Sequence, residues 1–597
     1  MSGGGEPRES ADAHGHAGPQ LTVRAAVTGA LLGALLALSN VYVVLKTGWS
    51  LGVLLTSTLL AYSGFRVLVA LGLARRELTI LENTAVASVA TAAAFMTGGG
   101  NMAALPALLI LTGERPGGVA MFVWFVVVAA LGVLAAIPIK RQLIDIERLP
   151  FPSSVAAAEM LRVLHGSARG SSAARGLVAA GALATLVTLA RQLRAPWFSL
   201  RLPGQIGIPM SLAGHPAAGY SLAFDGSLVL LGGGTLMSFR TAWSLLVSAL
   251  GTYAIFAPAM VRTGAITTVD YKSIVQLTLW PGAALLVASG VVSLLLDWRA
   301  LGRAVLGLRG LFGRSARAQV AGAREAPLRW FVVGLVVLVP VIVTLMRTLF
   351  GIPVLAGLLA IPVALVIAVV SARVNGETDM TPTKAVGPAT QLLFGAALPG
   401  NITANIMGAN VTAGVGLHAA DLLSDVKVGH MLGASPRQQV MAQLIGVVVG
   451  AAVVVPAFVL VVPNASVLGT TDLPAPAVLV WAGVSRALAT GLDALPHAAR
   501  VAIAVGAILG TALAILERWL PPRLRPYVPS AWGVGMAMVL PASSSIAMFL
   551  GAAVAASLRR ARPGAATSLT ALASGLIAGE SLTGITLVLA RAAGLAV

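Results

Sequence analysis

The sequence predicts an all-α integral membrane protein that crosses the lipid bilayer many times. Hydrophobic residues make up 57% of its 597 residues and charged residues only 10%, and the mean hydropathy is +0.90. A soluble domain carries about 25% charged residues, so a chain of this balance could not cover its own surface in water. Interrupted and uninterrupted apolar runs together predict about 14–16 transmembrane or re-entrant helices.

The positive charge of the chain does not indicate a nucleic-acid-binding protein. Lys and Arg number 40 against 21 acidic residues, a formal charge of +19, but they lie in short loops between apolar runs, as the positive-inside bias predicts. Cys is absent, which excludes disulfides, thiolate metal sites and a Cys nucleophile. We therefore expect the lipid bilayer as the main partner, no nucleic acid and no cofactor.

Each long apolar run has the length of roughly 20 residues that crosses the hydrocarbon core as a helix. These runs are 23–45, 48–72, 117–139, 174–190, 241–260, 276–296, 328–346, 351–371, 440–462, 499–518, 532–557 and 566–590. Other apolar segments are interrupted by Gly, Pro and polar residues: 79–112, 150–166, 224–239, 388–425 and 473–490. Backbone that breaks at membrane depth must line a cavity or lie within protein.

An Arg-rich loop, residues 297–329, divides the chain into parts of similar size and is expected to be cytoplasmic. We predict a disordered N-terminal tail (1–20), an N-terminal membrane half (21–296) and a C-terminal membrane half (330–597). The loops Gly204–Ala223 and Pro463–Pro476 lack Lys and Arg and are expected to face outward. Interrupted segments in both halves, 79–112 and 388–425, predict two related halves with a binding site between them.

Glu82 and Asn83 lie inside the first interrupted segment, in LENTAVASVATAAAFMTGGG. A carboxylate within a span costs about 2.5–3.5 kcal/mol on insertion scales. The acid either lines a cavity, where it binds substrate or carries a proton, or lies at the membrane interface after Arg75 and Arg76. The glycine run that follows would end the helix and expose backbone amides to a ligand.

Asn401, Asn405 and Asn410 recur in the second interrupted segment, within LPGNITANIMGANVTAGVG. An Asn side chain donates and accepts hydrogen bonds at once, which suits peptide-like amides and carboxylates. The same side chains can instead join neighbouring helices. Both interpretations stay open from the sequence.

His418, Asp421 and Asp425 follow at positions i, i+3 and i+7, so a helix places them on one face. They could form a proton relay, because buried acids and His exchange protons. They could equally be the polar end or gate of a span, with Lys427 and Arg437 as partners. Oxygen and imidazole ligands at this spacing are too common to specify a metal, and we predict none.

Glu580 lies midway along the last apolar run, so an interfacial position does not explain it and we assign it to substrate binding or coupling. Other charged residues near span ends are assigned to gates or helix caps. They are Lys46, Glu159, Arg240, Glu377, Asp379, Lys427 and Arg437.

Several of these segments resemble one family along nearly the whole chain, the oligopeptide transporter family, especially its yellow-stripe-like and bacterial branches. The matching segments, in the family's order, are LKTGWS, LENTAVASVATAAAFMTGG, LPFPSSVAAAEML, GETDMTP, AADLLSDVKVGHMLGASPRQQVMAQLIG, YVPSAWGVGMAMVLPASSSIAMFLG and ASGLIAGESLTG. The chain departs from the plant metal-chelate branch at Ser424, where Gln is frequent, and lacks the Asn-Pro-Gly motif of the fungal and plant peptide branch.

The resemblance implies secondary active, proton-coupled uptake of small peptides, modified peptides or metal chelates, through a bacterial inner membrane. It leaves a homo-oligomer open. Two alternatives are an ion-translocating membrane enzyme of the pyrophosphatase type and a passive channel. The enzyme would need several acidic clusters to hold Mg²⁺ and phosphate, and only Asp421 and Asp425 form one. No Gly-Lys pair is present for a phosphate-binding loop, so we predict no enzymatic activity.

Overall fold

The fold is known from a computed structural model. It describes residues 20–48, 53–72, 74–98, 100–166, 170–193, 202–296, 325–378, 383–491, 493, 495–521, 523–562 and 566–592. The predicted tail 1–20 lies outside these ranges except for its last residue, and so does most of the predicted loop 297–329.

Nearly all of the described residues are helical. Before the basic loop the helices are α1 (Val23–Thr47), α2 (Leu54–Ala70), α3 (Ile80–Phe95), α4 (Asn101–Thr112), α5 (Gly118–Lys140), α6 (Pro152–Gly166), α7 (Gly170–Gln192), α8 (Leu228–Leu236), α9 (Phe239–Leu250), α10 (Ala257–Arg262) and α11 (Tyr271–Leu296). After it come α13 (Leu328–Phe350), α14 (Val354–Thr378), α15 (Thr383–Ala397), α16 (Ile402–Leu432), α17 (Pro436–Val461), α18 (Pro476–Thr490), α19 (His497–Trp519), α20 (Ala531–Ala537), α21 (Ala542–Ala561) and α22 (Ala566–Ala592). The π-helical turns Arg141–Ile146 and Gly251–Phe256 extend α5 and α9, and short 3₁₀ turns occupy Ala217–Tyr220, Ala465–Val467 and Arg525–Tyr527.

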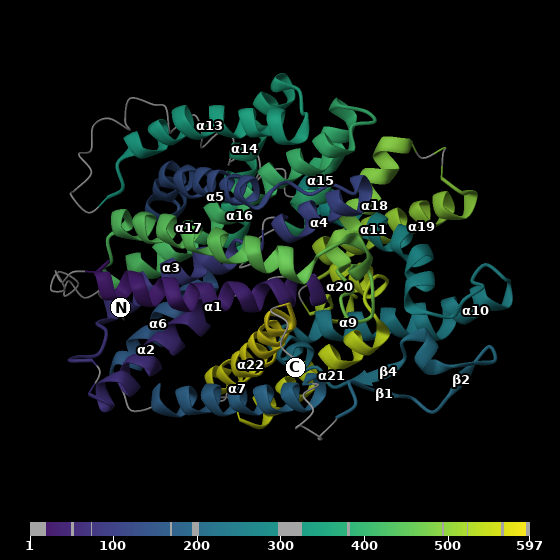
Figure 1. Ribbon diagram of the computed structural model, residues 1–597, viewed down its shortest axis with the longest axis horizontal. Helices are drawn as coiled ribbons and strands as arrows, with labels where there is room; N and C mark the ends of the chain where they lie inside the picture. The colour runs from purple at the N-terminus through teal and green to yellow at the C-terminus, as the bar shows by residue number, and fades with distance from the viewer. Residues whose placement is uncertain are drawn as a thin grey trace, which may run out of the picture.

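The predicted all-α, polytopic membrane class is confirmed. Within the described residues, 9 helices are long and apolar enough to cross a membrane, and shorter apolar helices include α3, α4 and α18. The strands are limited to one excursion: β1 (Gln205–Gly207) pairs with β4 (Ala223–Asp225), and β2 (Ser211–Leu212) pairs with β3 (His215–Pro216). This excursion lies at the opposite end of the molecule from the N-terminus (Figure 1).

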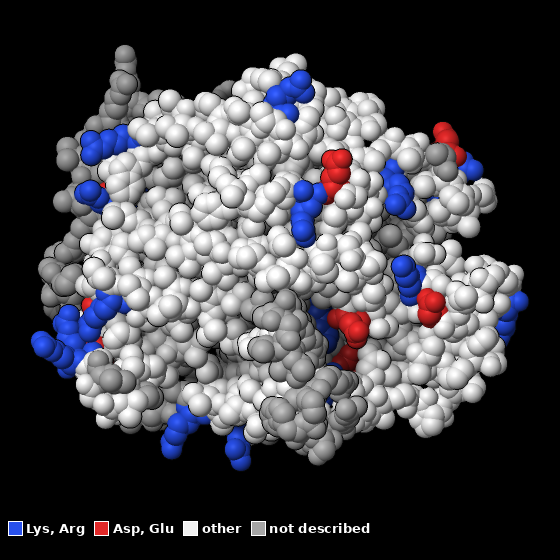
Figure 2. All heavy atoms as spheres, in the orientation of Figure 1, with Lys and Arg blue, Asp and Glu red and all other residues white. Residues whose placement is uncertain are grey.

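Long helices such as α1, α5, α13 and α17 run along the longest axis of the molecule (Figure 1). Figure 2 shows that Lys and Arg gather at the end of this face near the N-terminus, while the wide area beside them carries almost no charge. Exposed side chains on α13 and α19 are large and apolar, for example Val336 and Ile508, which is the surface that lipid requires.

Glycine lets several of these helices approach one another closely. A Cβ on Gly446 of α17 would lie 2.2 Å from the Val89 carbonyl oxygen of α3, and one on Gly450 would lie 2.4 Å from the Ala93 carbonyl oxygen. Pairs of glycines four residues apart make the same kind of contact on α1, α19 and α22. In lipid the hydrophobic effect does not favour helix association, so helices associate through the close packing that small residues allow. As a result α3 is held directly between α1 and α17.

The predicted interruption in 79–112 is confirmed: α3 ends at Phe95 and α4 begins at Asn101, after Gly100 with φ +82°. The prediction for 388–425 is wrong in its extent. The chain breaks only between α15 and α16, and α16 then continues for 31 residues through all of the polar positions. Several of these positions, among them Asn405, Asn410 and Asp425, contact side chains of neighbouring helices, so they need no opening of the backbone.

The predicted single run 532–557 is also wrong, because the chain leaves the helix between α20 and α21. Pro541 caps the start of α21, and a proline there cannot continue the preceding helix. The two related halves and the sidedness of the loops stay predictions.

Candidate functional site

A pair of buried carboxyl groups lies on α16, in the interior of the helical bundle. Asp421 is 7% exposed and Asp425 is 2% exposed. One amide, Gln443 Nε2 on α17, donates to both carboxyls, at 3.0 Å to Asp421 and 2.8 Å to Asp425. Thr91 on α3 donates to the same Asp425 oxygen at 2.9 Å. Neither carboxyl forms an ion pair with a Lys or Arg of the described residues, so two acids share neutral donors alone.

Buried polar atoms that lack a hydrogen-bond partner concentrate around this part of α16. In the described part of the chain they include both ring nitrogens of His418 and Gln443 Oε1, while Ser88 lies beside Asp425. Ser371 of α14 and Gln439 of α17, which also contact α16, carry further atoms of this kind. Because buried polar groups are normally paired with protein or water, this region has the chemistry to accept water, protons or a polar solute.

His418 shares the α16 face with Asp421 in sequence, but the structure does not join the two by a hydrogen bond. The His418 side chain is 1% exposed, and it lies against Gly132 of α5. Its role in a relay stays a prediction.

The asparagines at the start of α16 join helices. Asn410 accepts a hydrogen bond from Trp124 Nε1 at 2.7 Å and donates to Asn101 Oδ1 at 3.0 Å. Asn405 accepts from Gln391 Nε2 at 3.2 Å and from Ser485 Oγ. These contacts match the helix-joining interpretation, and nothing in them tests substrate binding.

Asn401 has a local role, because its side chain accepts from Ala404 N at 2.8 Å and caps α16. Such a cap satisfies one of the amide groups that a helix leaves open at its first turn.

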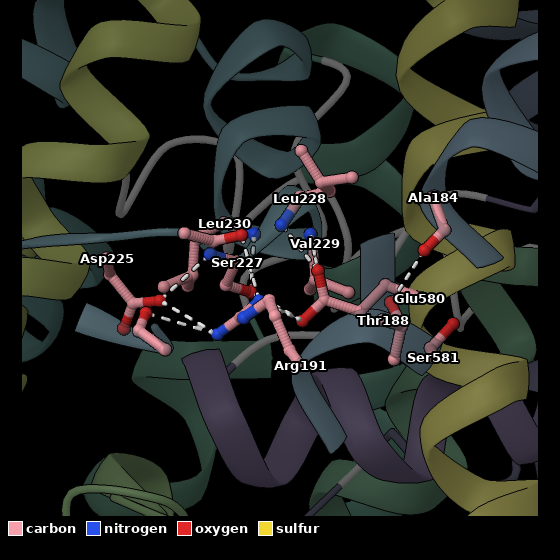
Figure 3. Close-up of polar contacts among 12 residues, drawn as sticks. Ala184, Thr188, Arg191, Asp225, Ser227, Leu228, Val229, Leu230, Glu580 and Ser581 are labelled. Atoms are coloured by element: carbon pink, nitrogen blue, oxygen red, sulfur yellow. Dashed lines mark hydrogen bonds and ion pairs between the residues drawn. The ribbon is translucent and has the colours of Figure 1, made fainter. Parts of the chain in front are cut away.

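Glu580 lies at the centre of a second polar network (Figure 3). It is fully buried on α22, and its carboxylate accepts from Ser227 Oγ at 2.8 Å and from the Val229 amide at 2.9 Å, as well as from the Leu228 amide. These donors form the N-terminus of α8, where a negative charge is stabilised. Glu580 therefore fixes α22 to the start of α8.

Arg191 of α7 lies between Glu580 and Asp225 in this network (Figure 3). Its guanidinium nitrogens are 3.8 Å and 3.7 Å from the two carboxylates, and they donate to the carbonyls of Gly226 at 2.8 Å and Gly204 at 3.3 Å. Lys46 is 7% exposed and lies near enough to Glu580 and Asp225 to interact electrostatically with both. The network thus contains two acidic and two basic side chains.

A cavity of about 20 Å³ lies among α1, α2, α8 and α22, roughly the space one water molecule occupies. Its polar lining is Ser39, Asn40, Thr56 and Ser574. Ser39 also contacts the hydroxyl of Ser581, the neighbour of Glu580. The interior therefore stays polar beyond the Glu580 network.

Glu82 lies at the first turn of α3 rather than in a cavity. It forms a capping box with Thr79, accepts from Thr22 at 3.0 Å and Arg24 Nε at 2.8 Å, and lies 3.8 Å from Arg76. These partners offset the cost of its burial, as the interfacial interpretation predicts. A transport role for Glu82 stays a prediction.

Asn83, next to Glu82, donates to the Thr58 carbonyl at 3.3 Å, and its side-chain oxygen has no partner among the described residues. The contact joins α3 to α2.

Most of the residues predicted as gates or caps lie near helix ends, but Glu159 lies midway along α6. Glu159 pairs with Arg162, and Arg240 pairs with Glu517 at 2.6 Å. Lys427 donates to the Leu149 carbonyl at 3.0 Å.

Arg437 lies over the Trp330 ring at 5.5 Å, and Glu377 pairs with the buried Arg373 at 3.0 Å. Arg373 also pairs with Glu147. Asp379 lies outside the described residues.

Sequence reasoning missed Gln443, Thr91, Arg191, Asp225 and Arg373 as members of these networks. Only Gln443 carried a usable signal: it follows Gln439 by one helical turn inside a long apolar run, a spacing that puts both amides on one face. The others depend on partners far away in the sequence.

Long apolar helices, an interrupted segment and charges buried within the helical bundle define a polytopic membrane protein of the transporter class. The family model described as OPT oligopeptide transporter protein matches residues 20–591. The chain belongs to the oligopeptide transporter family, as its motifs predicted, and it is a transporter of peptides or metal chelates, not an enzyme.

Several curated proteins resemble the chain over most of their length. "Putative oligopeptide transporter YGL114W" of Saccharomyces cerevisiae is 24% identical, over 94% of this chain and 95% of its own. "Probable metal-nicotianamine transporter YSL16" of Oryza sativa is 24% identical, over 94% of this chain and 90% of its own. "Iron-phytosiderophore transporter YSL15" of the same species is 25% identical, over 94% and 90%.

Proposed function

We propose that this protein is a secondary active transporter that uses an inward proton gradient to take up small peptides, modified peptides or metal chelates. The observation that carries proton coupling is the Asp421–Asp425 pair, buried on α16 with one shared amide donor, Gln443.

Two carboxylates this close in a low-dielectric interior cannot both stay ionised without a cation, because each charge disfavours the other. No described Lys or Arg pairs with them, so the pair holds a proton in the resting state. A pair of this kind titrates as one unit. A group that gains and loses a proton at membrane depth is what a proton-coupled transporter needs.

The surroundings of the pair support a coupling role. Asp425 contacts α3 through Thr91 and α17 through Gln443, and α3 is one half of the interrupted span that continues as α4. A change in the charge of Asp425 therefore alters contacts among three helices. Interrupted helices near the binding site are typical of transporters that alternate their access.

The substrate classes follow the relatives. The yeast relative carries the name of an oligopeptide transporter, and the rice relatives carry the names of metal-nicotianamine and iron-phytosiderophore transporters. Both classes bear carboxylates and amines, and peptides also bear amides, which suit the amides and charges of this interior. Of the predicted residues, we assign Asp421 and Asp425 to coupling and keep Asn405 and Asn410 as candidate substrate contacts, whereas the contacts of Glu580 favour a structural role.

Uptake into proteoliposomes tests the proposal. The purified protein is reconstituted, and an acidic exterior is imposed with the interior at neutral pH. We expect labelled trialanine or nickel–nicotianamine to accumulate above its external concentration, and an uncoupler to abolish the accumulation. Equilibration without accumulation would support the alternative, a passive channel, and would contradict secondary active transport.

Two further proposals concern the membrane in which the protein lies and its oligomeric state. Its resemblance to bacterial members of the family favours a bacterial inner membrane, and the apolar outer faces of α13 and α19 offer surfaces where a second copy could pack. The mass of the purified protein in detergent, measured by light scattering, tests the homo-oligomer directly.

A further inference from the structure

Arg191 is a buried cation that lies outside the proposed coupling site, Asp421 and Asp425. Its side chain is 10% exposed, and its Nε–H has no hydrogen-bond partner. A guanidinium carries five N–H donors in a planar fork, and here the described acceptors are two loop carbonyls, Gly226 O and Gly204 O. Leaving a buried donor unpaired carries a penalty, more so for a charged group.

The neighbouring carboxylates do not fill this fork. Glu580 makes its close hydrogen bonds to Ser227 and to the α8 amides, and it stays 3.8 Å from the guanidinium. Asp225 accepts from the Ser227 amide at 2.9 Å and stays 3.7 Å from the guanidinium. Both distances exceed the 2.7–2.9 Å of a charge-assisted N–H···O bond. The two acids balance the charge of Arg191 without using its donors.

The position of Arg191 suits a solute that arrives from one end of the molecule. It lies at the C-terminal end of α7 and contacts Gly204 and Gly226, which flank the excursion that carries β1 and β4. The two residues whose carbonyls it binds, Gly204 and Gly226, are exposed, and as glycines they place no side chain over the guanidinium. The lack of Lys and Arg in Gly204–Ala223 predicts that this end faces outward.

We propose that Arg191 is the recognition point for a carboxylate group of a zwitterionic substrate at the outer entrance of the transporter. This inference rests on the proposed uptake of peptides or metal chelates, both of which carry carboxylates. The Arg191 fork then forms the paired hydrogen bonds that planar guanidinium and carboxylate groups favour. Because Arg191, Lys46, Asp225 and Glu580 already balance one another, a zwitterion adds no net charge to the cluster.

A binding experiment on the purified full-length protein in detergent tests this role. The probes are trialanine, trialanine carrying a C-terminal amide, and nickel–nicotianamine. For the wild type we expect at least one carboxylate-bearing probe to bind, and trialanine amide to bind at least about ten-fold more weakly than trialanine where trialanine binds, which is the loss of one charge-assisted contact.

The variant R191K keeps the charge but removes the planar set of guanidinium donors, so we expect the Kd of the bound carboxylate probe to rise about ten-fold. The Kd of the amide should not change. R66K is the matched control, because Arg66 on α2 is exposed and pairs loosely with Glu77 at 3.6 Å. Its Kd values should equal those of the wild type.

The results separate the role of Arg191 from the proposed substrate classes. Equal wild-type affinity for trialanine and its amide overturns the inference without any variant, as does an R191K protein that binds the carboxylate probe as tightly as the wild type. In that case Arg191 only fixes the loop to α7, and uptake itself is unaffected. Failure of the wild type to bind either trialanine or nickel–nicotianamine instead contradicts the proposed substrate classes, and with them this inference.

Discussion

The buried acids of this transporter have two different kinds of surroundings. Glu580 is fully buried but surrounded by donors: the α8 amides, the Ser227 hydroxyl and, slightly farther, Arg191. Asp421 and Asp425 are almost as deeply buried, yet the described residues give them only neutral donors, chiefly Gln443 and Thr91.

The difference separates an acid that holds the fold together from acids that can change charge. A carboxylate that accepts hydrogen bonds from a helix N-terminus beside a cation links the elements that contact it. Two carboxyls without a cation must bind a proton to stay buried, and the energetic cost of losing it is transmitted to their neighbours. Substitutions at three positions test this distinction, taken from the largest expected effect to the smallest.

Asp425→Asn should abolish most proton-driven accumulation, a fall of at least about ten-fold, because the amide keeps the contacts to Gln443 and Thr91 but cannot release a proton. Exchange of labelled for unlabelled substrate across proteoliposomes, which needs no net proton movement, should persist. Asp493→Asn, at an exposed position, is the control. Accumulation by D425N at the wild-type level would show that the pair is not the coupling site.

Glu580→Ala should instead act on stability. It leaves Ser227, Leu228, Val229 and Arg191 without their carboxylate, and breaking a buried pair from one side costs about 3–5 kcal/mol. Glu580→Gln retains one acceptor oxygen and should cost about 1–3 kcal/mol. Thermal unfolding in detergent measures both. If E580A unfolds at the wild-type temperature, the proposed difference between the two regions is wrong.

Gly446→Ala tests whether the carboxyl pair depends on the packing of α3 against α17. The added Cβ would lie 2.2 Å from the Val89 carbonyl, and relieving that contact costs about 1–3 kcal/mol. We expect a modest loss of stability together with reduced uptake, because Thr91 and Gln443 move apart around Asp425. Gly118→Ala is the control, since nothing lies within 4 Å of its Cβ position. Identical uptake by G446A and G118A would count against this dependence.

The sequence predicts the class of fold well because the solvent imposes it. A chain with 10% charged residues and repeated apolar runs has no soluble alternative, and span length follows from the bilayer thickness. The continuity of α16 was not predictable in the same way. Asp425 of α16 accepts from Gln443 and Thr91, which lie 18 and 334 residues away from it in the sequence.

The positions of the candidate site residues could be predicted only where their hydrogen-bond partners are close to them in the sequence. The spacing of Thr79 and Glu82 is that of a capping box, so the sequence alone could have indicated the position that the structure gives Glu82. Glu580 was recognisable as a buried acid, but its partner Ser227 is 353 residues away. The functional roles assigned to these residues stay predictions that only transport measurements can test.

The alanine-rich helix α3 has a mechanical consequence. Where α3 meets Gly29 and Gly33 of α1 and Gly446 and Gly450 of α17, most of the facing atoms of α3 belong to its backbone or to alanine. Glycine and alanine have no side-chain torsion between heavy atoms, so at these points no long side chain interlocks with the neighbouring helix. A displacement of α3 along its own axis therefore meets little steric resistance from these two helices. Polar contacts, among them those of Glu82, Asn83 and Thr91, then help to fix its axial position. Asp425, as the acceptor of the Thr91 hydroxyl, therefore resists movement of α3 along its axis.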